Sequence, residues 1–79
     1  MKSLPTEDCW VAVEFTAPMP YPRFAIHPGD KWCFHTSTRP GFLETGCFDL
    51  AGGTVAPGFY KILLTTQSSK EVMKAADWI

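Results

Sequence analysis

The sequence predicts a small, mainly β protein: a strongly bent antiparallel sheet or a partly open barrel of about five strands, followed by a short C-terminal α-helix. Three observations support this. Short segments rich in β-branched and aromatic residues alternate with turn signals, Pro-Gly recurs at residues 28–29, 40–41 and 57–58, and the hydrophobic period becomes helical near the C-terminus. The 79 residues allow one domain, 1–79, within which residues 1–8 are expected to be flexible or loosely packed.

The first strands are predicted from alternation. In residues 9–16 one face carries Cys9, Val11, Val13 and Phe15, and the other carries Trp10, Ala12, Glu14 and Thr16. Residues 17–23 contain three alternating prolines, which predict an extended loop rather than a strand. Residues 24–27 and 31–36 follow as two short strands, separated by a turn at His27-Pro28-Gly29-Asp30.

The stretch Phe24-Ala25-Ile26-His27-Pro28-Gly29-Asp30-Lys31-Trp32 resembles the strand, Gly-Asp turn and strand hairpin of SH3-like barrels. This resemblance covers nine residues and implies a fold without implying an activity. Residues 59–66 are nearly continuous in apolar character, so we expect a central strand that is covered on both faces. Ser68 and Glu71 form a capping-box pattern, and helical spacing then continues to Ile79.

Composition and charge exclude several classes of protein. Seven basic and eight acidic side chains give a net charge of −1, which argues against a protein that binds duplex nucleic acid by neutralising phosphates. No apolar run, Ile62-Leu63-Leu64 included, approaches the roughly 20 residues that span a bilayer. Three cysteines cannot form a closed disulfide framework, and residues 1–8 have no apolar core for a signal peptide. We therefore expect reduced thiols and a cytoplasmic protein.

Surplus aromatic side chains point to protein binding. Six Phe, three Trp and two Tyr are more rings than a domain of this size buries completely, so some should form an apolar surface patch. Residues 18–24 are a candidate recognition loop, with a stiff connection between strands as the alternative. We expect contacts with a larger protein or complex, or with a second copy in a homodimer, from Trp10, Tyr21, Arg23 and Arg39. The alternative for Trp10 is packing under the C-terminal helix.

In size and style, the chain resembles the small single-domain proteins that phages and mobile elements make to inhibit or redirect host machinery, including anti-defence inhibitors. This resemblance implies a steric inhibitor that blocks a site needed by a substrate or subunit, in the host cytoplasm if the protein is phage-encoded. A bacterial accessory protein that caps a larger assembly is an equal alternative. Neither interpretation involves catalysis or a cofactor.

Two other functions remain open. A small barrel can bind single-stranded nucleic acid by stacking bases on exposed rings, here Trp32 and Phe34, with Lys31 and Arg23 as phosphate contacts. A zinc site is the third hypothesis: Cys33 and His35 would share one face of a strand, and Cys47 would add another ligand. The cysteines and histidines include the types needed for nucleophilic catalysis, but no local pattern arranges them.

Overall fold

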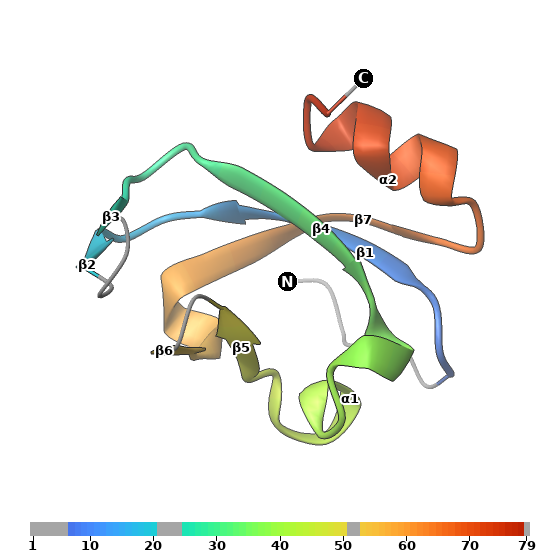
Figure 1. The fold of residues 1–79 in the computed structure, drawn as a ribbon, viewed down its shortest axis with the longest axis horizontal. Coiled ribbons are helices and arrows are strands. Elements are labelled where there is room, and N and C mark those ends of the chain that lie inside the picture. Colours follow the sequence, from blue (N-terminus) through green and yellow to red (C-terminus); the bar gives the residue numbers. More distant parts are fainter. Residues whose placement is uncertain (1–6, 21–24, 51–52, 79) are drawn as a thin grey trace.

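The computed structural model describes residues 7–20, 25–50 and 53–78. Its centre is a bent three-stranded antiparallel sheet in the order β4-β1-β7, made of β4 (Lys31–His35), β1 (Trp10–Phe15) and β7 (Tyr60–Thr66) (Figure 1). Two short hairpins pair β2 (Met19–Pro20) with β3 (Ala25–Ile26), and β5 (Phe48–Leu50) with β6 (Gly53–Val55). The mainly β fold with a bent sheet and a C-terminal helix is confirmed, and the described strands do not close into a barrel.

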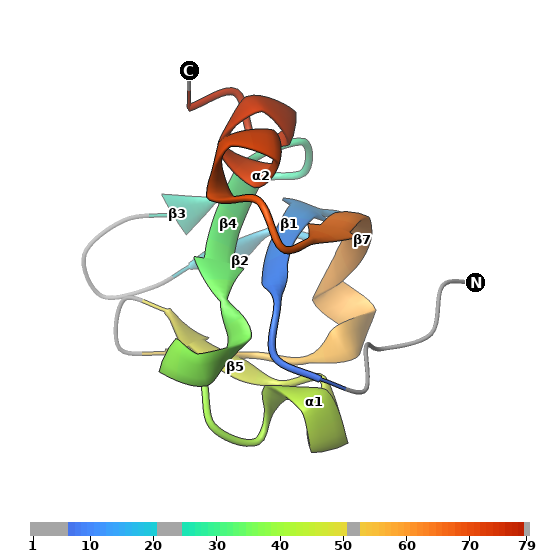
Figure 2. The same cartoon turned by 90° about the vertical axis from the view of Figure 1, so that its right-hand side faces the viewer.

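In the described ranges, four short helical segments connect or cover these strands. They are α1 (Phe42–Thr45), α2 (Ser69–Ala75) and two 3-10 turns, η1 (Thr36–Thr38) and η2 (Pro57–Phe59). Figure 2 shows α2 above the sheet, with β5 and α1 below it. The central sheet is therefore covered on both faces, on one by α2, which follows β7 in the sequence, and on the other by elements that lie between β4 and β7.

Strand β1 is the central strand, and its alternation builds both sides of the core. Val11, Val13 and Phe15 share one face, as predicted, and this face packs into the large cluster that the β5–β6 hairpin covers. Ala12, on the opposite face, is fully buried beside Val72 of α2. Because Ala12 is small, the helix can pack closely on the sheet at this point.

Strand β7 lies at an edge of the sheet, so the prediction of a central position was wrong. The register with β1 shifts between Ala12, opposite Leu64, and Val13, opposite Ile62, which leaves Leu63 as an extra residue. Such a bulge interrupts the alternation of side chains. Ile62 therefore packs on the large cluster while Leu63 and Leu64 both pack on the helix cluster. The continuous apolar run reflects this bulge rather than a strand buried on both faces.

Two of the three Pro-Gly pairs place glycine at a positive φ. Gly29 has φ +95° in the turn before β4, and Gly41 has φ +89° at the start of α1. Gly58 lies outside that left-handed region, within η2. Gly46, which no sequence pattern singled out, has φ +76°, and a Cβ there would lie 2.7 Å from Pro57 Cγ. Gly46 is therefore required by both backbone angle and space.

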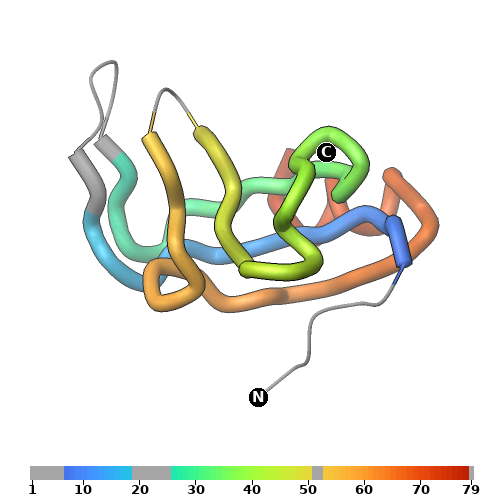
Figure 3. The backbone as a smooth tube through the Cα atoms, turned by 90° about the horizontal axis from the view of Figure 1, so that it is seen from below, coloured from blue at the N-terminus to red at the C-terminus, as the bar shows by residue number. Residues whose placement is uncertain are grey.

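The proline-rich segment contains a short strand where the sequence predicted a loop. Met19 pairs with Ile26 and Pro20 with Ala25, which is a correction to the expectation of no ladder in residues 17–23. Proline is tolerated because this two-stranded pairing leaves edge positions where no N–H is needed. Residues 21–24, the second half of the predicted recognition loop at 18–24, lie outside the described residues, as do residues 1–6. Figure 3 shows the β2–β3 and β5–β6 hairpins extending toward the same side of the molecule.

Helix α2 confirms the predicted change of period at the C-terminus. Ser68 occupies the N-cap position, but its side chain makes no capping hydrogen bond, so only the position of the predicted capping box is observed. Val72 is fully buried, and Ala76, one turn further on, is 4% exposed. A helix of seven residues is marginal alone, so this contact with the sheet holds it in place.

Candidate interaction surface

The most exposed tryptophan lies just after α2. Trp78 is 45% exposed, while its ring meets the ring of Trp32 edge to face, with centroids 5.1 Å apart. Trp32 itself is half-buried, and its indole Nε1 is buried without a hydrogen-bond partner in the part of the chain that the structure describes. The exposed Trp78 ring therefore packs against the ring of Trp32, whose indole N–H makes no hydrogen bond to the described residues.

Trp78 is held by the way that α2 ends. Its N–H donates to the carbonyl of Met73 at 2.8 Å, and the N–H of Asp77 donates to the carbonyl of Lys74 at 3.2 Å. This pair of bonds is the Schellman arrangement, which needs a left-handed residue and usually contains glycine. Asp77 occupies that position with φ +60°. The chain therefore has an aspartate in a backbone conformation that favours glycine.

The Asp77 carboxylate forms an ion pair with β4. Lys31 Nζ lies 2.7 Å from Asp77 Oδ2, joining residues 46 positions apart in the chain. The hydrogen bond to Asp77, and then the charge of Asp77, raise the pKa of Lys31. The Asp77 side chain is 73% exposed and that of Lys31 is 30% exposed, so solvent screens the pair and its contribution to stability is small.

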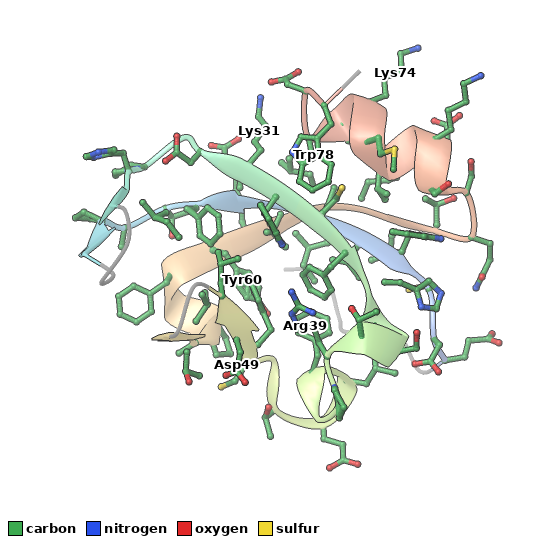
Figure 4. The ribbon with its side chains drawn as sticks, viewed as in Figure 1. Lys31, Arg39, Asp49, Tyr60, Lys74 and Trp78 are labelled. Carbon is green, nitrogen blue, oxygen red and sulfur yellow. The ribbon has the colours of Figure 1, made fainter. Side chains whose placement is uncertain are left out.

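Arg39 lies on the other side of β4 (Figure 4). Its Nε donates to the carbonyl of Asp49 at 3.1 Å, its Nη1 donates to the carbonyl and hydroxyl oxygens of Thr38, and its guanidinium carbon lies 5.8 Å from the centre of the Phe34 ring. No carboxylate in the described ranges forms an ion pair with it. Arg39 lines a hollow of about 510 Å³ together with Cys47, Asp49 and Thr54.

We use the name β4 surface for four residues that belong to β4 or flank it on its two sides, namely Lys31, Trp32, Trp78 and, on the opposite side, Arg39. It contains one predicted partner contact, Arg39, and two residues predicted for nucleic-acid binding, Lys31 and Trp32. Trp10 is elsewhere: it packs with the helix cluster and meets the His35 ring at 5.1 Å, which is the alternative that the sequence left open for it. Tyr21 and Arg23 lie outside the described residues.

Phe34 cannot stack a base from its position in this structure. It is 5% exposed, and its ring contacts those of Phe42 and Phe48 at centroid distances of 5.0 and 4.8 Å. The predicted stacking platform of Trp32 and Phe34 is therefore reduced to one half-buried ring. The alternation that put both rings on one face of β4 was right, but that face meets the core.

The residues predicted to bind zinc do not gather into a site. Cys33 and His35 share the α2 face of β4, while Cys47 lies between α1 and β5. No group of three metal-binding side chains occurs among residues 7–20, 25–50 and 53–78. Burial raises the pKa of the Cys33 thiol, which keeps it protonated and a poor nucleophile. Cys33 serves the core under α2.

Sequence reasoning missed the contributions of Asp77 and Trp78 to the surface. The helical period indicates where α2 lies, but its end has no glycine, so no signal predicted the left-handed residue that turns Trp78 back toward β4. Arg39 was predicted as a contact, although the sequence gave no reason for its half-buried position over Phe34.

Comparison with protein-family models, curated proteins and solved structures finds no match to this chain. Among the described residues, no helix is long and apolar enough to cross a membrane.

Proposed function

We propose that this protein is a binding module that attaches to a larger protein or complex through the β4 surface and acts sterically. The observation that carries the proposal is Trp78: a large apolar ring that is 45% exposed yet fixed by backbone bonds, an ion pair and a second tryptophan. A fixed ring loses little conformational entropy on binding, and tryptophan and arginine are enriched among residues that dominate protein interfaces. Arg39, without a carboxylate partner in the described part of the chain, supports the same surface.

The action that we propose is occlusion: the bound module covers a site that a substrate or another subunit of the partner needs. Single-stranded nucleic acid is the weaker hypothesis because Phe34 is buried. It predicts affinity for a labelled oligonucleotide that falls steeply with added salt, whereas protein binding through Trp78 needs no oligonucleotide.

The test is affinity capture from the cells that make the protein, with immobilised wild-type protein and two variants. Phe59 is the matched control because it is the other large hydrophobic side chain exposed among the described residues, at 38%. We expect Trp78→Ala to lose a protein that both the wild type and Phe59→Ala retain, with all three proteins folded by circular dichroism. Equal retention by Trp78→Ala would remove the β4 surface from the proposal.

A further inference from the structure

The hollow that Arg39 lines is a polar part of the surface, separate from the Trp78 ring. Figure 4 shows Arg39 and Asp49, which both line it, on the side of β4 away from Trp78. Six of its nine lining residues are exposed to solvent, namely Thr38, Pro40, Gly41, Thr45, Asp49 and Thr54. A ligand therefore reaches this hollow without displacing any part of the core.

Arg39 is held at the wall of the hollow by uncharged groups. Its Nε donates to the Asp49 carbonyl and its Nη1 donates to two oxygens of Thr38, and both of these residues line the hollow. These bonds and the Phe34 ring fix the guanidinium before a ligand arrives. No described residue accepts a hydrogen bond from Nη2, so this nitrogen keeps its N–H groups for a ligand.

The charge of Arg39 is less compensated than the charges of the lysines on the strands. Lys31 lies 2.7 Å from a carboxylate oxygen of Asp77, and Lys61 lies 3.8 Å from one of Glu14. Arg39 is half-buried, and no carboxylate in the described part of the chain forms an ion pair with it. Hydrogen bonds to an ionised acceptor are roughly twice as strong as neutral ones, so an anion is the ligand that this guanidinium favours.

The rest of the hollow favours an anion with one charge and few oxygens. The three threonine hydroxyls along it already donate elsewhere, to the carbonyls of His35 and Gly41 and to the Asp49 carboxylate. The guanidinium therefore has to supply the hydrogen bonds. A phosphate group has three acceptor oxygens and about two negative charges near neutral pH, and the Asp49 carboxylate would repel it more strongly than a carboxylate.

We propose that the hollow beside Arg39 binds an acidic side chain of the partner protein, with its carboxylate on the guanidinium. Sites for small molecules are mostly apolar and enclose their ligand. This hollow has charged and hydroxyl side chains and mostly exposed walls, which suit a side chain that belongs to a larger molecule. The inference rests on the proposed function and adds a second contact, across β4 from Trp78.

The test is a nuclear magnetic resonance titration of the isotope-labelled protein with two capped amino acids, N-acetylglutamate methylamide and N-acetylglutamine methylamide. They differ only in a carboxylate that replaces a carboxamide. We expect the glutamate compound to bind about tenfold more tightly, the effect of one charge-assisted hydrogen bond, and to shift the amide signals of Thr38 and Thr54. Inorganic phosphate should bind more weakly than the glutamate compound.

Three variants assign the binding to the guanidinium. Arg39→Gln should bind the two compounds equally, and Trp78→Ala should bind them as the wild type does. Asp49→Asn removes a nearby like charge but keeps an oxygen that can accept the Thr54 hydroxyl, so it should bind the glutamate compound about threefold more tightly. This gain makes the test independent of how well Arg39→Gln folds.

Affinity capture identifies the source of the carboxylate. Arg39→Gln should retain less of the partner than the wild type retains. Full retention by a folded Arg39→Gln would overturn the inference and leave Trp78-dependent capture intact. Equal binding of both compounds to the wild type would do the same, and tighter binding of phosphate would overturn the choice of a carboxylate. Self-association that Arg39→Gln abolishes in sedimentation experiments would overturn the choice of a different protein as occupant.

Discussion

The two faces of the central sheet are packed by different means. Under the β5–β6 hairpin, five aromatic rings fill a large cluster, namely Phe15, Phe34, Phe42, Phe48 and Tyr60. Under α2, the buried residues are small, with Ala12 and Cys33 from the sheet and Val72 and Ala76 from the helix and its C-cap, and larger, partly buried side chains pack around them. The aromatic side holds irregular elements of three or four residues, whereas the small-residue side holds one regular helix.

This difference shows how a chain of 79 residues packs irregular segments on one face of its central sheet and a helix on the other. Short irregular segments have few backbone hydrogen bonds of their own, so each needs a large ring to anchor it. A helix satisfies its own backbone and can lie close to the sheet if the residues between are small. The β4 surface lies beside the strand where these two packings meet.

The largest effect should come from the aromatic side. Phe42 is fully buried in α1, with ring contacts to Phe34, Phe48 and Tyr60. Phe42→Ala should lower the free energy of unfolding by about 3 to 5 kcal/mol, a large share of the stability of a small domain. Urea denaturation measures it, and Phe59→Ala, at an exposed ring, should change stability by less than about 1 kcal/mol. Similar losses in both variants would contradict the division between anchoring and surface rings.

The small-residue side should respond less. Val72→Ala removes two methyl groups from a fully buried position, and we expect a loss of about 2 kcal/mol. The loss should be concentrated in α2, so its amides should exchange faster while those of β1 stay protected. Met73→Ala, at a partly buried neighbour, is the control and should cost less. Uniform loss of protection across the sheet would show that α2 does not unfold separately from the sheet.

Sequence reasoning succeeded where one strand or helix decides the pattern by itself. The alternation of Val11, Ala12 and Val13 predicted β1 and both of its faces, and the period change predicted α2. It failed where the pattern depends on a neighbour. The apolar run around Leu63 became a central strand in the prediction because nothing in the run itself reveals a bulge.

The candidate surface was predictable to a smaller extent. Arg39 was expected at the surface, but its place over Phe34 depends on packing between η1 and β4. The position of Trp78 depends on a left-handed Asp77 and an ion pair to Lys31, across 46 residues of sequence. Such long-range pairs leave no local signal, so a surface assembled from them is visible only in the folded chain.

The smallest effect concerns one buried hydroxyl on the aromatic side. Tyr60 donates to the Gly46 carbonyl at 2.7 Å, so Tyr60→Phe leaves that carbonyl unpaired and should cost about 1 to 2 kcal/mol. Burial raises the pKa of Tyr60 to about 12, whereas an unfolded tyrosine titrates near pH 10. Between these values the folded state binds more protons than the unfolded state, so stability falls as pH rises.

The pH dependence separates the ionisation of Tyr60 from the loss of its hydrogen bond. Wild-type stability should fall more steeply than that of Tyr60→Phe from about pH 10 to pH 12, so the gap between the two proteins should narrow. Burial also raises the pKa of Cys9 and Cys33, but both proteins share those thiols, so their effect cancels in the difference. Urea titrations of both proteins at several pH values make the measurement. A constant gap would mean that Tyr60 ionises as readily in the folded chain as in the unfolded one, and that this side of the sheet is open to water.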